Sequence, residues 1–107
     1  MAGRRRAEVS GPILIPVTYE AFPGFELVQQ GLQDLTAKRE TAAALVVLIG
    51  APRLQRIGIR VPDTNLADPE HRLYELLARE DSDSAHSRYN ALIRRLVSFE
   101  RAAECAA

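Results

Sequence analysis

The chain has 107 residues, which is enough for one small domain and too few for a second hydrophobic core. It carries 14 basic and 14 acidic side chains, and 47% of its residues are hydrophobic. This composition is typical of a globular protein and excludes a disordered polyelectrolyte, a low-complexity chain and a strongly basic general nucleic-acid binder. Thirteen of the basic residues are arginine and only Lys38 is lysine. That imbalance indicates either the coding bias of a high-GC bacterial genome or selection for the bidentate guanidinium group.

Neither a targeting segment nor a membrane span is predicted. The longest apolar run, residues 42–49, is far shorter than the roughly 20 residues that a membrane helix needs. The apolar stretch after the N-terminal arginines contains Pro16 and is too short for the core of a signal peptide. Cys105 is the only cysteine, so no disulfide can form within the chain. We therefore expect a cytoplasmic protein whose fold depends on its core alone.

The N-terminal region is predicted to hold a tail and an arm. Residues 1–12 have little to bury, which predicts a flexible tail ahead of a single helical domain over residues 13–107. Residues 13–17 are mostly β-branched and apolar, but their proline restricts them to an edge strand or an extended arm. We expect this arm to pack on the helical core or on a neighbouring subunit.

The first helix is predicted over residues 23–37. Pro23 has the fixed φ angle that suits the first position of a helix. Apolar residues then recur at helical spacing and define one buried stripe, and Gly31 marks a close helix crossing. The stripe consists of Phe25, Val28, Leu32 and Leu35.

The second helix is predicted over residues 42–58, and its first part, residues 42–49, is ambiguous between helix and strand. Thr41 suits an N-cap, and apolar residues follow it on every side, which means burial as either helix or strand. The alanines at its start favour a helix, whereas the β-branched residues between 46 and 49 favour a strand. We expect a helix.

Three further residues carry signals for helix ends. Gly58 is predicted to end the second helix in a Schellman motif, with Ile59 packing back on Leu54. Asp68 is predicted to cap the next helix and Pro69 to occupy its first position.

The last two helices are predicted over residues 69–80 and 84–104. The acidic linker between them is so short that the two helices should form an antiparallel pair. The predicted fold class is therefore all-α, a small bundle of about four helical segments with an N-terminal extended arm. The alternative is an α/β fold in which residues 13–17 and 44–49 are strands.

The segment around Gly50 matches the pattern of two helices joined by a glycine, as in a DNA-binding helix-turn-helix. Arg53 and Arg56 would then lie on the recognition helix. The bulky Val46 at the crossing point and the short second helix count against this interpretation. The same segment lacks the lysine and second glycine of a phosphate-binding loop.

Arg53, Arg56 and Arg60 form a stretch of three positive charges with no acid between them. They are candidates for binding a phosphate, a carboxylate or an acidic partner surface. The simpler interpretation is a solvated face, or pairing with the acidic segment that ends the third helix. That segment supplies Glu75, Glu80, Asp81 and Asp83.

Charge is segregated between the last two helices. Residues 68–83 carry six acidic and two basic side chains, whereas residues 84–107 carry four arginines and two glutamates. Complementary charge of this kind orients adjacent helices or joins one subunit to another.

The sequence contains no recognisable catalytic or metal-binding constellation. His71 and His86 stand at the starts of two antiparallel helices, too far apart to share a metal ion. The serines lack the strained turn of a nucleophile elbow. We therefore predict no cofactor, no metal and no enzymatic activity.

The predicted function is that of a small helical protein–protein interaction or regulatory module that self-associates, with a dimer favoured and an unidentified protein partner. An apolar arm and a long striped terminal helix leave surface to bury after the chain has folded. The alternative is a DNA-binding transcriptional regulator that uses the segment around Gly50; no contact with a membrane is expected. The candidate self-association residues are Ile13, Leu14, Ile15, Leu92, Leu96 and Phe99.

Overall fold

Four helices form the regular structure of residues 19–106, the part of the chain that the computed structural model describes. They are α1 (Phe25–Thr36), α2 (Ala42–Arg56), α3 (Pro69–Glu80) and α4 (Ala85–Ala106). The all-α prediction is confirmed, and the described residues contain no strand. The α/β alternative is wrong for residues 44–49, which lie inside α2, while residues 13–17 lie outside the described part.

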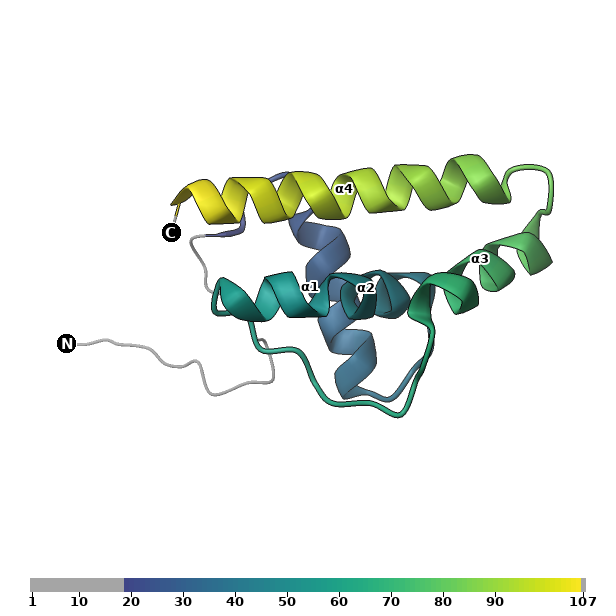
Figure 1. Cartoon of the computed structure of the whole chain (residues 1–107), viewed down its shortest axis with the longest axis horizontal. Helices are drawn as coiled ribbons and strands as arrows, with labels where there is room; N and C mark the ends of the chain where they lie inside the picture. The colour runs from purple at the N-terminus through teal and green to yellow at the C-terminus, as the bar shows by residue number, and fades with distance from the viewer. Residues whose placement is uncertain (1–18, 107) are drawn as a thin grey trace.

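The helix α4 runs along one side of the molecule, and α3 turns back from its start toward α2 (Figure 1). Both α2 and α4 contact each of the other helices, and α2 is the central one because its contacts with α1 and α3 are the most extensive in the fold. This position explains why its sequence is apolar on every side. The segment that looked ambiguous between helix and strand is therefore a helix surrounded by its neighbours.

Gly50 lies in the middle of α2 and makes no turn, so the helix-turn-helix geometry predicted there is wrong. Burial of the surrounding residues against three helices stabilises a continuous helix through both Gly50 and Pro52. Thr41 caps this helix as predicted, because its Oγ1 accepts a hydrogen bond from the Ala44 amide at 3.1 Å.

The helix α2 ends in the predicted Schellman motif. The Ile59 amide donates to the Leu54 carbonyl at 3.0 Å, and the Gly58 amide donates to the Gln55 carbonyl at 3.1 Å. Gly58 has a φ of +95°, a left-handed conformation that glycine adopts without a steric penalty. Ile59 and Leu54 are both fully buried, as the motif requires.

Two predicted helix starts need correction. The first helix begins at Phe25 rather than Pro23, with Gly24 as its N-cap at a φ of +80°. A Cβ atom on Gly24 would strike the Arg95 carbonyl oxygen, so close packing on α4 sets this start. Pro69 begins α3 as predicted, but Asp68 has a φ of +51° and its side chain makes no capping hydrogen bond.

The hydrophobic core joins all four helices. Every residue of the predicted α1 stripe is buried, and Gly31 lies where α1 crosses α2, with its Cα facing the Ala43 carbonyl and Val47. The Tyr19 and Phe22 rings close one end of the core around Phe99, and the Tyr19 hydroxyl donates to the Ile57 carbonyl at 3.2 Å. The largest fully buried side chains are Phe99, Leu45, Leu54, Ile59, Leu73 and Leu77.

Candidate functional site

The predicted arginine cluster does not act as one unit. Arg53 is held by two carboxylates of α4, with Nε and Nη2 on Glu104 at 2.6 and 2.7 Å and Nη1 on Glu100 at 3.2 Å. Arg56 and Arg60 are exposed. Arg53 therefore pairs with the last helix, not with the acidic segment at residues 75–83 that was the predicted alternative. Glu100 and Glu104 are four residues apart and therefore share a helix face, but that spacing alone does not show which residue faces them.

Pairing and burial shift the pKa values of Arg53, Glu100 and Glu104. Hydrogen bonding to Glu104 raises the pKa of Arg53, and the same hydrogen bonds lower the pKa of Glu104. Glu100 is only 3% exposed, and burial raises its pKa although the charge of Arg53 acts in the opposite direction. Because each of its three guanidinium nitrogens donates to a carboxylate of α4, Arg53 attaches α2 to α4 and has fewer N–H groups left for an external anion.

Two of the predicted self-association residues belong to the chain's own core. Phe99 is fully buried and Leu96 is 3% exposed, so neither presents a surface to a second molecule in this fold. Leu92 is half-buried and packs at the edge of the core. Ile13, Leu14 and Ile15 lie outside the described residues.

An aromatic surface covers the α3–α4 hairpin. Tyr74 is 41% exposed and is the only large hydrophobic residue of residues 19–106 with that much exposure. Its ring lies 5.8 Å from the Tyr89 ring and 6.5 Å from the His86 ring, measured between centroids. Burial raises the pKa of Tyr89, and the charge of Glu70 adds to the effect, which places Glu70 beside the same cluster. Tyrosines with an exposed edge and a polar tip are enriched at protein interfaces.

The aromatic surface continues along α4. Ile93 and Val97 follow Tyr89 at helical spacing and are half-buried, yet they do not pack against the core cluster. We call Tyr74, Tyr89, Ile93 and Val97 the hairpin flank. The sequence-based candidates on this helix were Leu92, Leu96 and Phe99 instead, because helical spacing alone does not show that Leu96 and Phe99 face the core.

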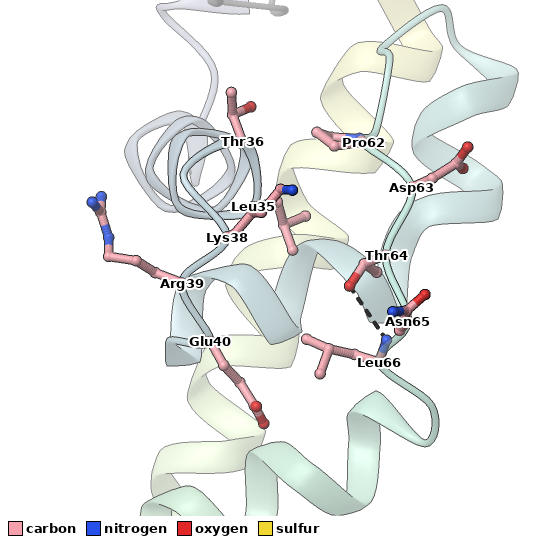
Figure 2. Close-up of a pocket in the computed structure, with 10 residues that line it drawn as sticks. All are labelled: Leu35, Thr36, Lys38, Arg39, Glu40, Pro62, Asp63, Thr64, Asn65 and Leu66. Carbon is pink, nitrogen blue, oxygen red and sulfur yellow. Dashed lines mark hydrogen bonds between the residues drawn. The ribbon is translucent and has the colours of Figure 1, made fainter.

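A pocket of about 680 Å³ opens between the α1–α2 loop and the loop from α2 to α3 (Figure 2). Leu35, Pro62 and Leu66 give it apolar walls, and polar side chains of residues 36–40 and 63–65 surround its opening. Figure 2 shows the Lys38 side chain reaching across the pocket toward Pro62. No predicted site residue lies here, and the only signal in the sequence was that Lys38 is the single lysine.

One wall of this pocket is fixed by a buried carboxylate. Asp34 accepts hydrogen bonds from Gln30 at 3.0 Å, from the Arg39 Nη2 atom at 2.7 Å and from the Thr41 hydroxyl at 2.6 Å. Burial alone would raise the pKa of Asp34, but these hydrogen bonds outweigh it and lower the pKa. Asp34 therefore holds the α1–α2 loop in place, because Arg39 and Thr41 both donate to its carboxylate from that loop.

No group of three or more His, Cys, Asp or Glu side chains in residues 19–106 is placed to hold a metal ion. No helix among these residues is long and apolar enough to cross a membrane. Cys105 is exposed near the end of α4.

Comparisons with models of known protein families, with curated proteins and with solved structures find no match to this chain. The hairpin flank and the pocket therefore have to be interpreted from their own geometry. They lie on different elements, the flank on α3 and α4 and the pocket on the two loops around α2.

Proposed function

We propose that this protein is a small protein–protein interaction module that self-associates through the hairpin flank. The observation that carries the proposal is the unequal covering of α4. Between His86 and Arg95 this helix has no buried residue, whereas Leu96, Phe99, Glu100 and Ala103 in its second half are all buried. In the first half Tyr89 and Ile93 are only half-buried, with Tyr89 at the edge of the core, and a second molecule would cover the parts that remain exposed.

Charge supports a second copy of the chain as the partner. Glu70 and Glu75 lie at the Tyr74 end of the flank, and neither is paired with an arginine of residues 19–106. Glu75 lies 3.1 Å from the His71 ring. Arg56 and Arg101 lie near Glu104 at the other end, because both act on the charge of that carboxylate. A two-fold arrangement with the two α4 helices antiparallel places the acidic end of each copy on the basic end of the other. Ile93 of one copy then meets Val97 of the second.

The test is the mass of the full chain in solution, measured by size-exclusion chromatography with light scattering at several concentrations. We expect a dimer for the natural chain and a monomer for Ile93→Glu, because a charge at the centre of the flank would be buried without a partner. Ala91→Glu is the matched control, since it adds the same side chain two residues away on the exposed opposite face of α4. Circular dichroism checks that both variants keep their helices.

A strictly monomeric natural chain at high concentration would contradict self-association altogether. A dimer that survives Ile93→Glu but is lost when residues 1–17 are removed would assign the contact to the N-terminal arm instead of the hairpin flank. Loss of the dimer in both Ile93→Glu and Ala91→Glu would show a general effect of charge, and the flank would again be the wrong surface.

A further inference from the structure

The helices α1 and α2 end in the same hydrogen-bonding motif, but with different residues at its left-handed position. At the end of α1 the Lys38 amide donates to the Leu35 carbonyl at 3.0 Å, and the Arg39 amide donates to the Asp34 carbonyl at 2.8 Å. This pattern is that of the Schellman motif at Gly58. Lys38 stands in the place of the glycine, with a φ of +61°.

A lysine at this position has a steric cost that glycine would avoid, because its Cβ crowds the backbone in the left-handed region. Nothing in the helix stop itself needs the side chain, since the motif uses only backbone atoms. Backbone strain of this kind is found most often where a side chain is needed for binding or catalysis. In a chain with 13 arginines, the single lysine occupies this strained position.

The Lys38 side chain extends into the pocket between the two loops (Figure 2). Leu35 is 7% exposed and, with Pro62 and Leu66, supplies apolar surface next to the aliphatic part of the lysine. A volume of about 680 Å³ lies within the range of small-molecule sites. Thr64 lies on the opposite loop, where its Oγ1 accepts the Leu66 amide at 3.3 Å and keeps its own proton to donate.

Two positive and two negative side chains line the pocket, namely Lys38, Arg39, Glu40 and Asp63, so the charge that faces a ligand depends on which of them are paired elsewhere. Arg39 is paired with Asp34 at 2.7 Å, and Glu40 is paired with Arg72 at 3.0 Å. The Asp63 carboxylate is turned away from the pocket (Figure 2). Among the described residues neither Lys38 nor Asp63 takes part in an ion pair. Because the Asp63 carboxylate is turned away, the Lys38 ammonium group is the unpaired charge that faces the pocket.

The geometry points to a binding site for a small organic monoanion, a carboxylate with an apolar body. Lys38 pairs with the carboxylate, Thr64 donates to it, and Leu35, Pro62 and Leu66 cover the apolar part. One ammonium charge balances a single carboxylate, whereas a phosphate group carries a charge of about −1.5 to −2 at pH 7 and would be left partly unneutralised. This inference is independent of self-association, because the hairpin flank shares no residue with the pocket.

The test is a titration of the 15N-labelled full chain with octanoate, followed by NMR. We expect saturable shifts centred on the amides of Leu35, Lys38 and Leu66. Octylammonium has the same apolar body with the opposite charge, and inorganic phosphate has the charge without the body. Both should bind at least tenfold more weakly than octanoate.

Lys38→Gly is the most informative variant, because it removes the ammonium group and also relieves the left-handed strain. We expect it to resist denaturant at least as well as the natural chain and to bind octanoate at least tenfold more weakly. Arg79→Gln is the matched control, since it removes an exposed cation of α3 that forms no ion pair in the described structure, and it should bind octanoate normally.

Three results would overturn the site. One is unchanged octanoate affinity in Lys38→Gly, and another is the absence of saturable shifts at the two loops. The third is equal binding of octanoate and octylammonium, which would show that the pocket selects for apolar surface and not for the anion.

Discussion

At Glu100, burial and pairing act on one carboxylate in opposite directions. The side chain is almost fully covered by α2, and one of its oxygens lies 2.7 Å from the place where a Cβ atom of Gly50 would be. Arg53 reaches the other oxygen at 3.2 Å. The net effect is a raised pKa, so the attraction of the arginine does not fully offset the loss of water. The exposed Glu104 has a lowered pKa through its hydrogen bonds with the same arginine.

The raised pKa predicts a pH-dependent gain of stability in Glu100→Gln. Below pH 4.5, the ordinary pKa of this group, Glu100 is protonated in the folded and the unfolded chain, so the variant and the natural chain should have similar free energies of unfolding. As the pH rises through the higher folded-state pKa, the natural chain loses stability that glutamine keeps. Urea denaturation from pH 4 to pH 8 should show the difference growing with pH in favour of Glu100→Gln.

The groups that face Glu100 are Arg53 and Arg56 of α2 and Glu104 of α4 itself. All three remain in the variant, so the difference between the two curves isolates Glu100. A variant that becomes progressively less stable than the natural chain toward neutral pH would show that the pairing with Arg53 exceeds the cost of burial.

The packing of helices depends on two glycines of different character. At Gly31 an added Cβ would meet the Ala43 carbonyl oxygen, a backbone atom that cannot move without moving α2. At Gly50 it would meet the Glu100 Oε2 atom and the ends of the Leu96 side chain, at 2.7 to 3.0 Å. At the α1–α2 crossing the space beside the glycine is therefore filled by a backbone atom. At the α2–α4 crossing it is filled by the ends of side chains, which can move.

This contrast predicts that replacing each glycine with alanine changes the free energy of unfolding by different amounts. Gly31→Ala should lower the free energy of unfolding by about 2 kcal/mol, as expected for overpacking against a rigid neighbour. Gly50→Ala should change it by less than about 1 kcal/mol, because alanine is the better helix former and offsets part of the strain. Chemical denaturation of both variants checks the order, and equal losses would contradict the distinction between the two crossings.

The helices themselves were largely predictable from sequence. Caps and periodicity are local signals, so Thr41, Gly58 and Pro69 placed helix ends close to their positions in the fold. The exceptions depend on contacts between distant segments. Gly24 starts α1 because α4 lies against it, and Gly50 is helical because three helices surround it.

The candidate sites were less predictable, because each combines residues far apart in sequence. The pocket needs residues 35–40 and 62–66 to come together, and no spacing rule links them. The pairing of Arg53 with Glu104 spans 51 positions. For α4, periodicity identified an apolar stripe but could not show that Phe99 faces the core while Ile93 lies at its margin.

For the molecule as a whole, stability should be unevenly distributed. The first half of α4 has no buried residue between positions 86 and 95, whereas the second half is anchored in the core. In dilute solution, amides of residues 86–95 should therefore exchange with solvent roughly tenfold faster than those of residues 96–103. Native-state hydrogen exchange measures this directly.

Protein concentration separates the possible outcomes of that measurement. Protection of residues 86–95 should rise with concentration as copies associate through the hairpin flank. Equal protection of the two halves of α4 in dilute solution would contradict the prediction that the first half opens more readily than the second. Protection that is uneven but independent of concentration would leave the fold as described and contradict the association.

The position of Cys105 has a practical consequence. This thiol is the only one in the chain and is exposed in the last turn of α4. Figure 1 shows that this end of α4 lies at the opposite end of the helix from the α3–α4 turn. A spin label or fluorophore can therefore be attached without any substitution and without obstructing Tyr74 or Ile93. In a pair of antiparallel α4 helices the two labels would point to opposite ends of the assembly, whereas in a parallel pair they would sit together. The natural chain thus carries its own reporter for the orientation of any complex it forms.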